Sequence, residues 1–187
     1  KVGIIGATGM VGQRFATLLE NHPWFTVTAL AASKRSAGKT YKECVESRWA
    51  MTTPIPKAME DMIILDAANV EEVASKVDFV FCAVDMPKDQ IRELEEAYAK
   101  AECPVVSNNS AHRHTPDVPM VIPEINADHI KIIDSQRKRL GTKKGFVAVK
   151  SNCSLQSYVP AVHPLRELGC NKVLACTYQA ISGAGKT

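Results

Sequence analysis

Short continuous apolar runs recur along the chain, separated by segments with helical spacing or by turn residues. Runs of this length, bounded by glycine, proline and polar residues, are typical of strands buried on both faces of a sheet. We expect strands at residues 2–6, 25–31, 62–65, 78–84, 104–107, 145–150 and 173–181.

Apolar residues spaced three or four apart follow several of these runs and predict helices. The first helix has a predicted apolar face of Val11, Phe15, Leu18 and Leu19, and it ends before Pro23. Further helices are expected at 70–77, after Pro87 and at 153–168, the last with Pro160 inside it. Residues 37–60 show no clear pattern. Strands that alternate with helices predict an α/β fold, a Rossmann-like doubly wound parallel sheet.

A glycine-rich turn joins the first strand to the first helix. Its glycines, at positions 6, 9 and 12, have the spacing GxxGxxG, a variant of the dinucleotide fingerprint. Glycines let the backbone approach a pyrophosphate, which binds the free N–H groups at the helix N-terminus. The position of this turn between a strand and a helix favours nucleotide binding over a turn without a ligand.

The end of the second strand indicates which nucleotide is bound. NAD-binding proteins place an acidic residue there for the ribose hydroxyls. Here the sequence is Ser33, Lys34, Arg35 and Ser36, with no acid. Hydroxyl groups and a guanidinium suit a 2′-phosphate, so NADP is favoured over NAD.

Ligands of doubly wound sheets bind beyond the carboxyl ends of the strands. Ala83 and Asn108 follow two predicted strands and are candidates for cofactor contact. The polar loop 107–114 contains Arg113, which can bind a phosphate or a carboxylate. The alternative for this loop is that its polar residues only cap a turn.

Cys153 follows a predicted strand and begins a predicted helix. The helix dipole and free N–H groups at such a position stabilise a thiolate, which suits a nucleophile. The adjacent Asn152 can orient a substrate or donate a hydrogen bond to an oxyanion. Buried cysteines are more often inert core residues, so the residues alone leave both readings open.

Composition narrows the class of protein. The 45% hydrophobic and 23% charged content excludes a disordered or fibrous chain, and a net charge of +3 gives no reason to expect a nucleic acid or a membrane surface as partner. The six cysteines form no CxxC pair, so we expect reduced thiols and no metal site. Without a signal peptide, a cytoplasmic protein is expected.

The terminal GKT resembles a P-loop but lacks its first glycine, because residue 180 is alanine.

Four motifs together resemble the aspartate-β-semialdehyde dehydrogenase family, in its archaeal and fungal-type branch. They are GATGMVGQRF at 6–15, SNNSAHR at 107–113, SNCSLQ at 151–156 and YQAISGAGK at 178–186. The resemblance covers the whole chain, and the second pair of motifs is the more specific. It implies NADPH-dependent reductive dephosphorylation of L-aspartyl 4-phosphate to L-aspartate 4-semialdehyde, a step toward lysine (through diaminopimelate), threonine, methionine and isoleucine.

The resemblance also implies roles for individual residues. Cys153 would form a thioester with the substrate, Arg113 would bind its phosphate and Gln179 would position the acyl-enzyme. The cofactor contacts it implies are Thr8, Gly9, Met10 and Val11 at the pyrophosphate, Ser33, Arg35 and Ser36 at the 2′-phosphate, and Ser182 and Gly183 near the nicotinamide.

The chain has about half the usual length of this family. We therefore expect an NADP-binding domain at 1–150 and, at 151–187, the start of an α+β catalytic and dimerisation domain. The family implies a homodimer or homotetramer, a small-molecule substrate and a general base later in the sequence. Two alternatives stay open: a malonyl-CoA reductase-like enzyme, and an NADP-binding fragment without turnover.

Overall fold

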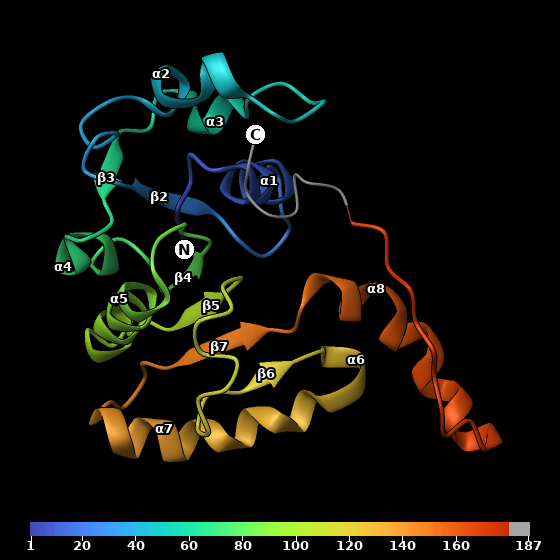
Figure 1. Cartoon of the computed structure of the whole chain (residues 1–187). Helices are drawn as coiled ribbons and strands as arrows, with labels where there is room; N and C mark the ends of the chain where they lie inside the picture. The colour runs from blue at the N-terminus through green and yellow to red at the C-terminus, as the bar shows by residue number, and fades with distance from the viewer. Residues whose placement is uncertain (180–187) are drawn as a thin grey trace.

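The computed structural model describes residues 1–179 and contains a seven-stranded sheet in which every neighbouring pair of strands is parallel (Figure 1). The strand order is β3-β2-β1-β4-β5-β7-β6. The chain moves outward from β1 in one direction and then, from β4, in the other. This is the predicted doubly wound arrangement. The strands are β1 (Val2–Ile5), β2 (Val27–Ala32), β3 (Ile64–Asp66), β4 (Phe79–Cys82), β5 (Val105–Ser107), β6 (Met120–Val121) and β7 (Val147–Lys150).

Helices connect the strands and cover both faces of the sheet. The α-helices are α1 (Met10–Leu19), α2 (Tyr41–Val45), α3 (Lys57–Glu60), α4 (Val70–Ala74), α5 (Lys88–Lys100), α6 (Pro123–Asn126), α7 (Ile133–Leu140) and α8 (Cys153–Val162). Short 3₁₀ helices are η1 (Glu46–Arg48), η2 (Ala127–Ile132) and η3 (His163–Leu168).

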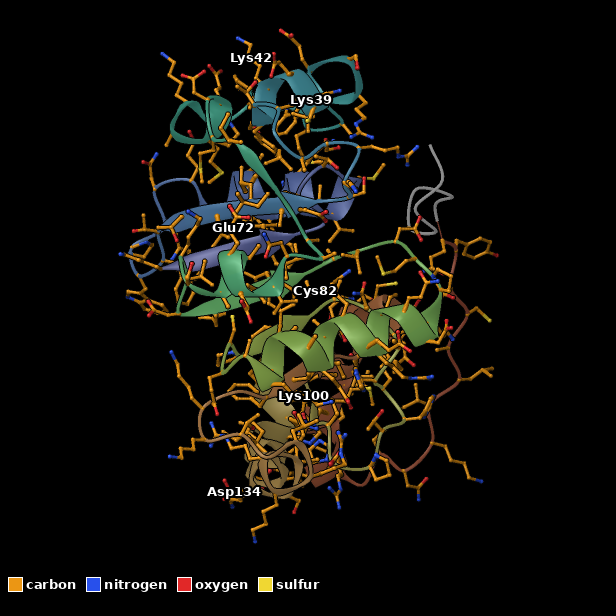
Figure 2. The ribbon with its side chains drawn as sticks, turned by 90° about the vertical axis from the view of Figure 1, so that its left-hand side faces the viewer. Lys39, Lys42, Glu72, Cys82, Lys100 and Asp134 are labelled. Atoms are coloured by element: carbon orange, nitrogen blue, oxygen red, sulfur yellow. The ribbon has the colours of Figure 1, made fainter. Side chains whose placement is uncertain are left out.

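Two hydrophobic clusters, one on each face of the sheet, make the core. On one face, Ile4 and Leu30 pack with residues of α1, α2 and α3. On the other, Ile5 and Cys82 pack with residues of α4 and α5. Figure 2 shows α5 lying across this second face. Successive residues of a strand point to opposite faces, so the continuous apolar runs fill both clusters.

The buried face of α1 agrees with the prediction only in part. Leu19 is buried and Phe15 packs against the core, whereas Val11 and Leu18 are 42% and 57% exposed. The other buried positions are Gly12, Gln13 and Ala16. The physical reason is a close approach: a Cβ on Gly12 would collide with the Gly6 carbonyl oxygen. Because only glycine permits this contact, the side of α1 that carries Gly12 packs against the glycine turn, and Val11 and Leu18 lie away from the buried face.

Residues 37–60, which had no clear pattern, contain α2, η1 and α3. Thr40 begins α2 with a capping box, in which its hydroxyl accepts the Glu43 N–H and the Glu43 carboxylate accepts the Thr40 N–H. This local signal was present in the sequence. The helices have only four or five residues, too few for a helical period to be recognised.

The entry to β7 is held by a single carboxylate that lies two residues past the end of α5. Glu102 accepts N–H bonds from Lys143, Lys144 and Gly145. These bonds lower the pKa of the Glu102 carboxyl, the Lys143 contact most. A Cβ on Gly145 would collide with the Ala99 carbonyl oxygen, so this glycine allows α5 and the β7 entry to touch. The two contacts fix the strand that precedes Cys153.

Beyond β7 the chain leaves the sheet (Figure 1). The predicted helix is present as α8 followed by η3, with Pro160 in the last turn of α8. The predicted strand at 173–181 is wrong for its described part, because residues 173–179 are exposed and have no strand assignment. A strand needs hydrogen-bond partners from a neighbouring strand, and no described segment pairs with these residues. Among residues 1–179, no helix is long and apolar enough to cross a bilayer.

The packing of α1 generates a stability prediction. Gly12→Ala is expected to destabilise the protein by about 1–3 kcal/mol, because the new methyl group must push α1 away from the Gly6 carbonyl. Gly9→Ala is the matched control, since its Cβ would lie 3.5 Å from the same oxygen, an ordinary contact. Thermal unfolding of both variants measures the difference. Equal melting temperatures would contradict the close-approach explanation.

Candidate functional site

The parallel register brings four strand ends to one edge of the sheet. Ile5 is paired with Cys82, Cys82 with Ser107, and Ser107 with Val149. The residues that follow these positions therefore emerge side by side. Two backbone bonds extend the alignment beyond the strands: the Ala83 N–H donates to the Ile5 carbonyl and the Asn108 N–H to the Cys82 carbonyl, each at 2.8 Å.

The glycine turn lies at this edge, between β1 and β4, where the direction in which strands are added to the sheet reverses. Gly6 has φ of +85°, and a Cβ there would collide with the Ala83 carbonyl oxygen. Gly9 precedes α1 with no side-chain cap, and the first turn of α1 has no acidic residue. The free N–H groups of the helix N-terminus are thus available to an anion.

A pocket of about 780 Å³ opens beside this turn. Its lining has three parts: the glycine turn, a basic side and an apolar wall. The basic side comes from the end of β2 and from η1, and the apolar wall comes from the ends of β3 and β4, from α4 and from α5. Carboxylates also line it, from Asp66, Asp85 and Glu93. Residues of the turn, the basic side and the apolar wall include Gly6, Thr8, Gly9, Ser33, Lys34, Arg35, Arg48, Ala67, Ala83, Val70, Leu94 and Ala97.

Arg48 on the basic side was missed from the sequence. It lies in the segment that showed no pattern, and Gln13 holds that segment against the glycine turn. The Gln13 amide nitrogen lies 3.2 Å from the Thr8 carbonyl and 3.3 Å from the Arg48 carbonyl, and its oxygen accepts the Ala50 N–H at 2.9 Å. Gln13 is 2% exposed, so these contacts are made inside the fold.

The predicted cofactor residues fall into three groups: those that line the pocket, those that do not, and those outside the described residues. Thr8, Gly9, Ser33, Arg35 and Ala83 line the pocket. The structure does not place Met10, Val11, Ser36 or Asn108 on its wall. Ser36 is 9% exposed. Ser182 and Gly183 lie outside the described residues.

Cys153 is the first residue of α8 and is exposed. The Asn152 side-chain oxygen accepts the Ser154 N–H at 2.9 Å and caps the helix. The amide nitrogen of Gln179 lies 2.9 Å from the Cys153 sulfur. The structure thus brings together two predicted residues that are 26 positions apart in the chain. An N–H donor at this distance stabilises a thiolate.

Arg113 extends from the 107–115 loop to the end of β7. Its Nε donates to the Lys150 carbonyl at 3.2 Å, and both side chains are half-buried. Burial lowers the pKa of Lys150, and the positive charge of Arg113 lowers it further, while Cys153 acts in the opposite sense. Two neighbouring cations near a thiol favour an anionic ligand. Lys150 was missed because, in sequence, it is one lysine at the end of a strand.

Comparisons with known proteins identify the relatives of this chain. Residues 1–133 match the family described as semialdehyde dehydrogenase, NAD binding domain. The aspartate-semialdehyde dehydrogenase of Archaeoglobus fulgidus is 42% identical over 98% of this chain and 51% of its own length. That of Cryptococcus neoformans is 39% identical over 99% and 50%, respectively. The chain spans about half the length of the curated relatives it matches.

A solved structure with the same fold holds a nucleotide. The aspartate semialdehyde dehydrogenase of Candida albicans, crystallised with NADP, superposes with a TM-score of 0.77 at 37% identity. The match covers 89% of this chain and 46% of that one. A second, from Vibrio cholerae, has a TM-score of 0.62 at 27% identity and covers 89% and 46%.

The cysteines are expected to differ in reactivity. Burial raises the pKa of Cys82 well above its usual value, with the Glu95 charge adding to the effect, and burial raises the pKa of Cys103 to about 11. At pH 8, iodoacetamide should therefore modify exposed Cys153 and leave Cys82 and Cys103 unmodified in the folded protein. Peptide mass spectrometry measures this, with Cys153→Ser as control. Modification of Cys82 as fast as Cys153 would contradict the assignment.

Proposed function

Because the chain belongs to the semialdehyde dehydrogenase family, we propose that it is the cofactor-binding and thiol-bearing half of an aspartate-semialdehyde dehydrogenase. The protein would convert L-aspartyl 4-phosphate to L-aspartate 4-semialdehyde and phosphate. The observation that carries the proposal is the Cys153–Gln179 contact of 2.9 Å at the same sheet edge as the glycine-turn pocket.

NADP suits the pocket in size and chemistry. A volume of about 780 Å³ is within the usual range for a small-molecule site. The glycine turn would hold the pyrophosphate, and Arg35 and Arg48 would hold the 2′-phosphate. The apolar wall of Ala67, Val70 and Leu94 would cover the adenine. When bound, NADPH supplies the hydride for the reduction.

The residues around Cys153 account for the acyl-transfer step. The Cys153 sulfur would attack the acyl carbon of the substrate, and the bond from that carbon to the phosphate oxygen would break. Phosphate leaves with the electron pair, while Arg113 and Lys150 neutralise its charge. Gln179 and Asn152 would orient the acyl group. Reduction then breaks the carbon–sulfur bond, which releases the aldehyde and returns the thiolate.

The proposal also covers the domain boundary, the oligomeric state and the biosynthetic pathways that the protein would serve. Residues 1–150 would form the NADP-binding domain and 151–187 the start of the catalytic and dimerisation domain, because the sheet ends at Lys150 and the chain then leaves it. A homodimer or homotetramer in the cytoplasm would serve lysine, threonine, methionine and isoleucine biosynthesis. The general base would lie in the part of the family's sequence that follows Thr187.

The activity is tested in the full-length protein that contains this sequence. Reduction of NADP by aspartate semialdehyde should require phosphate, and Cys153→Ala should lower kcat/KM by about 10⁴-fold or more. Cys170→Ser is the matched control and should keep activity, because Cys170 is exposed, does not line the pocket and directs its thiol at the Lys172 carbonyl. Activity with malonyl-CoA instead, or NADPH binding without turnover, would replace the proposal by one of those functions.

Cofactor choice provides a second test. Arg48→Gln should weaken NADPH binding by about tenfold, the equivalent of roughly 1.4 kcal/mol for one charge-assisted contact, and leave NADH binding nearly unchanged. Lys42→Gln removes the same charge from α2, outside the pocket lining, and should affect neither ligand. Figure 2 shows Lys42 on α2, and η1, which carries Arg48, follows α2 directly in the chain. Calorimetric titration measures both affinities. Equal losses for NADPH and NADH would overturn the 2′-phosphate assignment.

A further inference from the structure

A buried polar cluster lies between α5 and the 107–115 loop. Glu95 and His112 are each 1% exposed, and Ser107 is 2% exposed. Ionisable side chains are almost never this buried unless they are paired. The mechanism proposed above uses none of these three residues, although Arg113 directly follows His112 in the chain.

One oxygen of Glu95 ties α5 to the start of the loop. Glu95 Oε1 accepts a hydrogen bond from the Ser107 hydroxyl and another, at 3.0 Å, from the Asn109 amide nitrogen. A second residue of α5 adds to the attachment, since Arg92 Nε donates to the Ala111 carbonyl at 2.8 Å. Side chains of α5 thus hold both the side chains and the backbone of the loop.

The other oxygen of Glu95 and one nitrogen of His112 face each other. Glu95 Oε2 and His112 Nε2 are 4.0 Å apart, and neither atom has a hydrogen-bond partner among the described residues. The second imidazole nitrogen, Nδ1, is 3.0 Å from the Thr115 hydroxyl. An unpaired buried polar atom destabilises a fold, whereas a shift of about 1 Å would bring these two atoms within hydrogen-bond distance.

We propose that Glu95 and His112 are a positioning pair, in which His112 Nε2–H donates to the Glu95 carboxylate and so sets the conformation of the 107–115 loop that presents Arg113. This rests on the proposed role of Arg113 in binding the substrate phosphate. The loop is then attached to α5 at one end and, through Arg113 and the Lys150 carbonyl, to β7 at the other.

The burial of this pair favours positioning over stabilisation. Removing two ionisable groups from water costs free energy that their attraction returns only in part, so apolar residues would pack α5 at least as well. A hydrogen bond with defined direction can instead select one loop conformation. Cys82, which also contacts the cluster through Asn109 at 3.5 Å, stays a neutral thiol because burial raises its pKa.

Two substitutions at position 112 separate the two imidazole contacts. Glutamine places its amide nitrogen near the position of Nε2, so His112→Gln should keep the Glu95 contact and lose the Thr115 contact. Asparagine places its amide near Nδ1, so His112→Asn should do the opposite. In the full-length protein, we expect His112→Asn to raise KM for phosphate by about tenfold and His112→Gln by less than about threefold. KM for NADP should stay unchanged in both.

The control for lost stability is Met59→Ala, a core truncation in α3 on the opposite face of the sheet. It should lower the melting temperature without changing KM for phosphate. Unchanged phosphate KM in His112→Asn, or equal increases in both variants, would overturn the positioning pair. A wild-type protein whose activity needs no phosphate would instead overturn the proposed function.

A measurement on the wild-type protein does not depend on activity. In protein labelled with ¹⁵N-histidine, the imidazole ¹⁵N and ¹H signals report which ring nitrogen carries the proton. The proposal requires a protonated His112 Nε2 whose proton signal moves in Glu95→Gln. An unprotonated Nε2 would overturn it, whatever the outcome for catalysis.

Discussion

The parallel register of β1, β4, β5 and β7 determines where the functional segments of this chain lie. In parallel strands the carboxyl ends meet at one edge, so whatever follows each strand is placed beside its neighbours. The glycine turn, the loop that carries Arg113 and the helix that begins with Cys153 therefore converge, although up to about 150 residues separate them. The nucleotide pocket and the thiol site are two consequences of one sheet.

Close backbone contacts turn this convergence into a usable site. Gly6 lets the turn approach Ala83, Gly12 lets α1 approach the turn, and Gly145 lets β7's entry approach α5. In each place a methyl group would separate the elements. Polar side chains then hold the irregular segments, with Gln13 attaching η1 to the glycine turn and Glu95 attaching the 107–115 loop to α5. Gln13 and Glu95 thus support the site although neither lines the pocket.

Much of the fold could be predicted, because the short apolar runs that mark the strands are also the residues that fill the core. Apolar runs marked all but one of the sheet strands; β6 has only two residues and no such run. The exposure of Val11 and Leu18 on α1 could not be predicted from hydrophobicity, since Gly12 contributes no apolar side chain yet packs closely against the glycine turn. The prediction of a strand at 173–179 was wrong for a different reason. Its apolar residues fit a strand, but a strand also needs a partner that the pattern of one segment does not contain.

The alternation of strands and helices, the glycine turn and the position of Cys153 at a helix start could all be predicted from the residues, because each depends on residues close together in the chain. Packing in three dimensions was needed to show that Arg48 joins the basic side of the pocket, that Lys150 lies beside Arg113, that Gln179 contacts the Cys153 sulfur and that Glu95 faces His112. These contacts join segments distant in sequence. Their distances and burial arise from how the sheet and helices pack, and no local pattern carries that information.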